Sequence, residues 1–194
     1  IVTLARLGVG KFHISDFDEY EVHNFNRQAG AFMSTVGQAK VKVMEKICLD
    51  INPEAELKSF PEGIFEHNVD EFLDGVDVYV DSLDFFALEA RKLVFQKCLE
   101  KKIPLVTAAP LGMGCALLCF MPGGMSYEEY FRFEDAKSEN EQYIKFLIGL
   151  SPAMLQRPYL VDSSKADFHA KKGPSMPMAV KLCSGVAGTH VLKI

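Results

Sequence analysis

Carboxylates follow two apolar segments of this sequence, at positions typical of ligand-binding acids. Asp16 lies at the end of the apolar segment 11–17, with Asp18 close behind, and Asp81 and Asp84 follow the apolar segment 76–80. In open α/β sheets, ligands bind at the carboxyl ends of strands, where an acid can accept hydrogen bonds from ribose hydroxyls. A carboxylate there can also hold Mg²⁺ against phosphates, because Mg²⁺ takes few protein carboxylates and keeps several waters.

Residues suited to phosphate lie between these two acidic groups. The segment 24–28 reads Asn-Phe-Asn-Arg-Gln, and Lys40 follows it near the start of a predicted helix over 37–51. The Arg27 guanidinium can bind a phosphate through two parallel hydrogen bonds, and Lys40 is a compact charge for the same anion. The dipole at the start of a helix also favours anions.

Each of these residues also has a structural interpretation. Asp16 could lie in a solvated loop, and Asp84 could cap the helix that follows it, because Asp is a favoured N-cap residue. Lys40 could belong to a solvated helix face together with Lys42 and Lys46. Singly, none of these residues is specific, whereas their order along the chain is.

The elements that must position these residues alternate along the first 121 residues. Runs of β-branched and aromatic residues predict strands, and apolar residues at helical spacing predict helices. The predicted strands cover 11–17, 55–60, 76–80, 103–108 and 115–121, and the predicted helices cover 2–7, 37–51, 69–73 and 86–102. The alternation predicts an α/β fold, namely a Rossmann-like, doubly wound, mainly parallel sheet with helices on both faces.

The chain changes character after residue 121. Residues 122–178 form an expected crossover segment that includes a helical stretch at 138–149, and residues 179–194 form an expected closing helix of the same domain as 1–121. The chain opens on an apolar pattern rather than on Met. We therefore expect the first strand of the domain, with its Gly-rich loop, to lie upstream of Ile1.

Composition excludes several classes of protein. The chain has 194 residues and a formal net charge of −5, so it lacks the basic balance of a nucleic-acid-binding domain. Its five cysteines have no framework spacing, which predicts reduced thiols and a cytoplasmic location. No apolar run reaches the roughly 18 residues of a membrane span.

The ordered motifs resemble the ThiF/MoeB/HesA family, the bacterial relatives of ubiquitin-activating enzymes. The resemblance covers residues 1 to about 121. The matching segments are Leu7-Gly8-Val9-Gly10, Asp16-Phe17-Asp18, Asn24-Phe25-Asn26-Arg27-Gln28, Val36-Gly37-Gln38-Ala39-Lys40, Ile51-Asn52-Pro53 and Asp81-Ser82-Leu83-Asp84. The resemblance implies an ATP-dependent adenylyltransferase that activates the C-terminal glycine carboxylate of a small ubiquitin-like or sulfur-carrier protein.

The resemblance also implies ATP and Mg²⁺ as cofactors and a role for each motif. Asp84 would hold Mg²⁺, and Arg27 and Lys40 would act with it in catalysis. The implied nucleotide-binding residues are Asp16, Asp18, Asn24, Arg27, Gln28 and Lys40. Attack of a carboxylate on the α-phosphate brings anions together, so positive charge and a metal must offset the repulsion.

Cysteine positions depart from the pattern of many relatives. The chain has no Cys-x-x-Cys pair, so we expect no structural zinc. Cys115 and Cys119 fall on one face of a predicted strand and are expected to be buried core thiols, with Cys183 packed in the closing helix. The family's acceptor cysteine often lies in the crossover segment, and residues 122–178 contain none, which argues against a thioester or persulfide step.

Three other functions remain open. A tRNA-modifying, ATP-dependent family member would need a basic surface. The only residues that suggest one are Lys97, Lys101, Lys102 and the pair Lys171-Lys172. A non-catalytic pseudo-subunit that supports an active partner is disfavoured by the retained site residues. A nicotinamide oxidoreductase is a further alternative, but in such an enzyme the segment 24–28 would have no role. His169 and the lysine pair are placed either in a substrate channel or in a solvated loop.

Two further expectations concern assembly. The segment 115–121 has no polar alternation, so both faces of that strand must be covered. A single chain has few elements left to do so, which, with the family resemblance, predicts a homodimer with a twofold interface. The shared position of Asp16 and Asp84 at strand ends predicts that they face one crevice.

Overall fold

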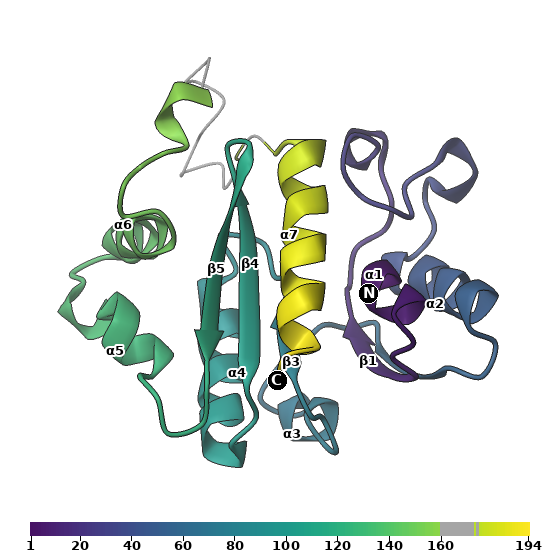
Figure 1. The fold of residues 1–194 in the computed structure, drawn as a ribbon, viewed down its shortest axis with the longest axis horizontal. Coiled ribbons are helices and arrows are strands. Elements are labelled where there is room, and N and C mark those ends of the chain that lie inside the picture. Colours follow the sequence, from purple (N-terminus) through teal and green to yellow (C-terminus); the bar gives the residue numbers. More distant parts are fainter. Residues whose placement is uncertain (160–172, 174) are drawn as a thin grey trace. The chain divides into compact units, whose positions relative to one another are not determined.

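The chain folds into two compact units, residues 1–76 and residues 77–194. The computed structural model describes residues 1–159, 173 and 175–194 (Figure 1). Each unit combines strands with helices and contains a parallel strand pair, so the predicted α/β class is confirmed. His169, Lys171 and Lys172 lie outside the described residues.

The first unit is built around a parallel strand pair. Its two strands run side by side from the pair Lys11↔Glu56 to the pair Ser15↔Phe60. Parallel neighbours need a crossover connection, and here the long helix α2 supplies it. The elements, in order, are α1 (Val2–Arg6), β1 (Lys11–Ser15), η1 (Val22–Asn24), η2 (Met33–Thr35), α2 (Lys40–Ile51), β2 (Glu56–Phe60) and α3 (Val69–Phe72).

The start of α2 differs from the prediction. Helix was expected from residue 37, yet α2 begins at Lys40. The preceding residues pair instead with residues 18–20: the Gly37 N–H donates to the Tyr20 carbonyl (2.8 Å) and the Tyr20 N–H donates to the Gln38 carbonyl (2.9 Å). Gly37 has a φ of 77°, a left-handed conformation that glycine adopts easily and that is incompatible with a helix.

The second unit holds a three-stranded sheet in the order β3-β4-β5, with β3 parallel to β4. Tyr79 pairs with Leu105 and Asp81 pairs with Thr107. The elements, in order, are β3 (Tyr79–Asp81), α4 (Leu88–Lys101), β4 (Leu105–Leu111), β5 (Gly114–Phe120), α5 (Tyr127–Phe131), η3 (Phe133–Asp135), α6 (Glu139–Leu150), η4 (Arg157–Tyr159) and α7 (Pro177–Val191).

The last two strands form an antiparallel hairpin rather than a parallel pair. Only Gly112 and Met113 separate the paired residues Leu111 and Gly114. Gly112 has a φ of 59°, and glycine at the first central position is typical of a tight hairpin turn. A two-residue connection cannot carry a crossover, so the strands must be antiparallel.

The chain itself provides cover on both faces of β5. The Phe120 ring lies 6.1 Å from that of Phe95 on α4, whereas the Cys115 thiol interacts with Cys183 of α7. Side chains at positions 115 and 120 point to opposite faces of a strand, and α7 lies along β4 and β5 in Figure 1. The premise that a second copy must cover this strand is therefore wrong, and the homodimer stays a prediction that rests on the family resemblance.

The cysteine predictions are confirmed in part. Cys183 is buried, as expected for a packed residue of α7. Cys115 is only half-buried and Cys119 is exposed, so the expectation of two core thiols on β5 is wrong. β5 lies at the edge of its sheet, where side chains near a strand end stay open to solvent. None of the described helices is long and apolar enough to cross a membrane.

Candidate functional site

Three of the predicted site residues meet at the carboxyl end of β1. Lys40 is the first residue of α2, and its backbone N–H donates to the Asp18 carbonyl at 2.9 Å. Its Nζ donates to Asp18 Oδ2 at 2.6 Å and lies 4.0 Å from Asp16 Oδ1. The pairing of residues 18–20 with residues 37–40 therefore places the lysine beside both acids.

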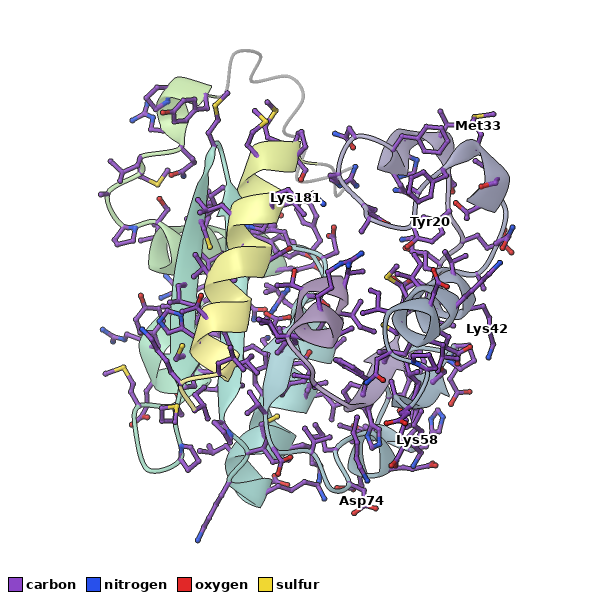
Figure 2. All side chains as sticks on the ribbon, turned by 45° about the vertical axis from the view of Figure 1, so that its right-hand side comes forward. Tyr20, Met33, Lys42, Lys58, Asp74 and Lys181 are labelled. Carbon is purple, nitrogen blue, oxygen red and sulfur yellow. The ribbon has the colours of Figure 1, made fainter. Side chains whose placement is uncertain are left out.

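Lys40 does not belong to a solvated helix face. It is 8% exposed, whereas Lys42 and Lys46 on the same helix are exposed. Lys42 points outward in Figure 2 and pairs with Glu45 one helical turn along, at 2.9 Å. The interpretation as a solvated helix face holds for Lys42 and Lys46 and is wrong for Lys40. A buried ammonium held among carboxylates is a functional-site candidate, because burial of a charge requires specific partners.

Asp16 lies directly after β1, where the sequence placed it. Its Oδ1 accepts the Asp18 N–H at 2.9 Å, which orients the carboxylate. Partial burial raises the pKa of Asp16, and the Asp18 N–H and the Lys40 charge oppose that rise without cancelling it. A partly desolvated carboxylate has oxygens that can accept hydrogen bonds from a ligand.

The segment 24–28 is held by local contacts. Asn24 is 2% exposed, and its Oδ1 accepts the Glu21 N–H at 3.0 Å, so this oxygen closes the turn η1. The Arg27 Nη1 donates to the His23 carbonyl and to Asn26 Oδ1, both at 3.0 Å. These contacts anchor one edge of the guanidinium. The roles of Asn24, Arg27 and Gln28 at phosphates stay predictions.

In the second unit, two neighbouring acids have opposite environments. Asp81 is 6% exposed, and its Oδ2 accepts from Arg91 Nε at 2.9 Å and from Thr107 Oγ1 at 3.0 Å. Asp84 is exposed, and its Oδ1 accepts the Phe86 N–H at 3.0 Å in an Asx turn. Asp84 is therefore the carboxylate open to a ligand.

The N-cap interpretation of Asp84 is wrong. Helix α4 begins at Leu88, two residues later than the predicted start, and its N-cap is Ala87, which makes no side-chain capping bond. The Asx turn at Asp84 ends before the helix starts, because the side chain bonds the N–H two residues on. A role for Asp84 outside the helix cap thus remains open.

Arg91 is the residue that the sequence analysis missed. It is 2% exposed on α4, on the stripe that carries the buried residues Val94, Phe95 and Cys98. Burial lowers the pKa of Arg91, but the adjacent Asp81 charge outweighs this and holds the pKa above its ordinary value. The sequence did hold a signal for it, because Arg91 falls at helical spacing from these buried residues. A pattern that counts only apolar residues passes over an arginine in that position.

The donor chemistry of these residues fits a nucleotide and its magnesium. A lysine ammonium has three N–H donors, and Asp18 takes one at contact distance, which leaves donors for phosphate oxygens. Mg²⁺ needs only one or two protein carboxylates when phosphates supply other ligands, and the exposed Asp84 offers one. The described residues contain no group of three or more His, Cys, Asp or Glu side chains that could hold a metal ion.

Asp16 and Asp84 belong to different units. That the two carboxylates face one shared crevice stays a prediction.

Comparison with known proteins extends this picture. The chain is 37% identical over 106 residues to the tRNA threonylcarbamoyladenosine dehydratase of Bacillus subtilis, covering 54% of this chain and 41% of that protein. It is 31% identical over 121 residues to the adenylyltransferase and sulfurtransferase MOCS3-1 of Zea mays, covering 62% of this chain and 25% of that protein. The chain thus spans about two fifths or less of the length of these relatives.

Solved structures share the fold. The structure of Escherichia coli MccB with ATP matches 99% of this chain and 50% of the MccB chain, with a TM-score of 0.66 and 21% sequence identity. The sequence model of the ThiF family matches residues 1–194, the whole of the chain. The predicted resemblance is confirmed, and this protein belongs to the ThiF family.

Proposed function

We propose that the chain is the nucleotide-binding part of an ATP-dependent adenylyltransferase that activates a carboxylate as an acyl-adenylate. The observation that carries the proposal is the buried Lys40 ammonium, held beside Asp16 and Asp18 at the carboxyl end of β1. A strand end is where α/β proteins bind nucleotides, and a buried cation there suits a polyanion. The family supports the same chemistry.

Each residue has a defined task in this proposal. The Asp16 carboxylate accepts a hydrogen bond from a ribose hydroxyl, as acids at this strand position do. The remaining N–H donors of Lys40, and the other edge of the Arg27 guanidinium, bind phosphate oxygens. Asp84 would hold Mg²⁺, which neutralises phosphate charge when the nucleotide is bound. Together these charges offset the repulsion between the attacking carboxylate and the α-phosphate.

For the acceptor we favour the C-terminal carboxylate of a small ubiquitin-like or sulfur-carrier protein. The formal net charge of −5 disfavours a nucleic-acid substrate, whose binding rests on lysine and arginine contacts to phosphates. Lys97, one of the lysines that hinted at a basic surface, pairs with Glu100 at 3.1 Å. The name of the Zea mays relative, which joins adenylyltransferase to sulfurtransferase, fits a sulfur-carrier acceptor.

A second candidate acceptor is a modified tRNA. The observation that favours it is the 37% identity to a tRNA threonylcarbamoyladenosine dehydratase. The threonyl group of that nucleoside carries a free carboxylate, so activation by ATP suits this acceptor equally well. Only the acceptor differs between the two candidates, and the nucleotide site is common to both.

Pyrophosphate exchange with ATP tests both candidates. The full chain is incubated with ATP, labelled pyrophosphate and one acceptor: a carrier protein ending in glycine, the same carrier with its last glycine removed, or tRNA with or without threonylcarbamoyladenosine. We expect exchange that requires the intact carrier. Exchange that requires the modified tRNA would replace the carrier with the second candidate. ATP binding without exchange on any acceptor would favour the pseudo-subunit, and absence of ATP binding would overturn the proposal.

A further inference from the structure

The loop that carries Asp84 is held by hydrogen bonds from one buried side chain, that of Arg91. Arg91 Nη2 donates to the Leu83 carbonyl at 2.8 Å and to the Asp84 carbonyl at 3.1 Å. Its Nε donates to Asp81 Oδ2 at 2.9 Å, at the end of strand β3. One guanidinium therefore joins the strand end to the backbone of the exposed acid.

The surroundings of Arg91 fix its orientation. The guanidinium carbon lies 4.7 Å from the centre of the Phe146 ring of α6, within the distance of a cation–π contact. Thr107 shares the Asp81 oxygen from the neighbouring strand β4, so Asp81 is held from two sides. A planar fork can make these bonds at fixed angles, whereas a lysine ammonium would present a single point charge.

The loop also has hydrogen bonds of its own. The Leu83 N–H donates to Asp81 Oδ1 at 3.1 Å, and the Phe86 N–H donates to Asp84 Oδ1 at 3.0 Å. The position of the exposed Asp84 carboxylate is thus set by backbone that the guanidinium holds. A purely stabilising ion pair would need only Asp81, yet two of the three hydrogen bonds that Arg91 makes to described residues go to the loop carbonyls.

We propose that Arg91 is a positioning residue for Asp84: its guanidinium holds the loop 82–84 so that the Asp84 carboxylate can take a magnesium ion bound to nucleotide. This inference rests on the proposed function, because it assumes that Asp84 meets a metal–nucleotide complex. Groups that orient a metal-binding side chain in this way affect metal affinity by about 10- to 100-fold. Arg91 itself touches neither metal nor nucleotide in this scheme.

The test measures ATP binding by calorimetry with and without Mg²⁺, for the full chain and for Arg91→Lys, Asp84→Asn and the double variant. The readout is the gain in ATP affinity on adding Mg²⁺. We expect Arg91→Lys to lower that gain about tenfold or more and to leave metal-free ATP affinity unchanged. We expect no further loss in the double variant, because a residue that acts through Asp84 has nothing to position once its charge is removed.

Thr107→Val is the matched control. It removes the other side-chain hydrogen bond to Asp81 Oδ2 but leaves the loop carbonyls untouched. It should lower stability and keep the full gain from Mg²⁺. If Arg91→Lys does not fold, Phe146→Leu takes its place, because it keeps the ion pair and removes the ring that orients the guanidinium. The same direction of change, with a smaller size, is expected for it.

Amide hydrogen exchange gives a readout that needs no nucleotide. Loss of the fork should speed exchange at the Leu83 and Phe86 amides relative to amides in α6. Unchanged exchange there, a full Mg²⁺ gain in Arg91→Lys, or a further loss in the double variant would each overturn the positioning role. If the unaltered chain binds no ATP in either condition, the proposed function fails as well. If the unaltered chain binds ATP more tightly with Mg²⁺ and Arg91→Lys shows the same gain, this inference alone fails.

Discussion

Replacing Lys40 with methionine separates a phosphate-binding role from a folding role. Methionine keeps the length of the apolar stem and removes the ammonium that bonds Asp18 Oδ2 at 2.6 Å. The Lys40 side chain is 10% exposed, but that of Asp18 is 54% exposed, so solvent screens their interaction. We therefore expect Lys40→Met to cost less than about 1 kcal/mol in free energy of unfolding.

The expected effect on nucleotide binding is larger. A hydrogen bond to a charged group contributes about 1.5–3 kcal/mol, so loss of one such bond to phosphate should weaken ATP binding by roughly 10- to 100-fold. The loss should grow when ionic strength falls, because Asp16 and Asp18 then repel the phosphates with less screening. Urea unfolding measures the first quantity, and calorimetric titration with ATP at two salt concentrations measures the second.

Lys42→Met is the matched control. It changes the net charge by the same amount on the same helix, but Lys42 is exposed and pairs only at the surface with Glu45. We expect it to leave ATP affinity within about twofold, since scattered surface charges contribute little. Equal weakening by Lys40→Met and Lys42→Met would show that net charge alone matters, and would refute contact between Lys40 and phosphate.

Four other outcomes are expected. Asp84→Asn keeps an oxygen for the Phe86 N–H, so stability in urea should change by less than about 1 kcal/mol. The Mg²⁺-dependent gain in ATP affinity should be lost, and a retained gain would contradict the metal role. Burial raises the pKa of Asp16 in the folded chain. The free energy of unfolding should therefore fall as pH rises from about 4 through that raised value. Asp16→Asn should flatten this fall in urea titrations and weaken ATP binding. Gly30→Ala would press a methyl group against the buried Tyr20 hydroxyl and should cost about 1–3 kcal/mol in urea unfolding; an unchanged midpoint would be the contrary result. The predicted homodimer should give a light-scattering mass near twice 21.6 kDa at micromolar concentration, and a mass of 21.6 kDa at every concentration would count against it.

The order of elements and the strand-end acids could be predicted from the sequence. The strand before Asp16, the helix that contains Lys40 and the long helix now seen as α4 all follow from local periodicity, because apolar spacing is a property of neighbouring residues. The motif order was specific enough to indicate the family that the comparisons confirm. These features need no knowledge of distant contacts.

Distant contacts decided the rest. Asp81 and Asp84 follow the same strand, and nothing in their neighbours shows which one turns inward; Arg91 and Thr107, from two other elements, make Asp81 the buried partner. Likewise, pairing between residues 18–20 and 37–40 buries Lys40 while Lys42 stays in solvent. A buried charge is stable only beside its partners, and partners far apart in the sequence meet only once the chain has folded.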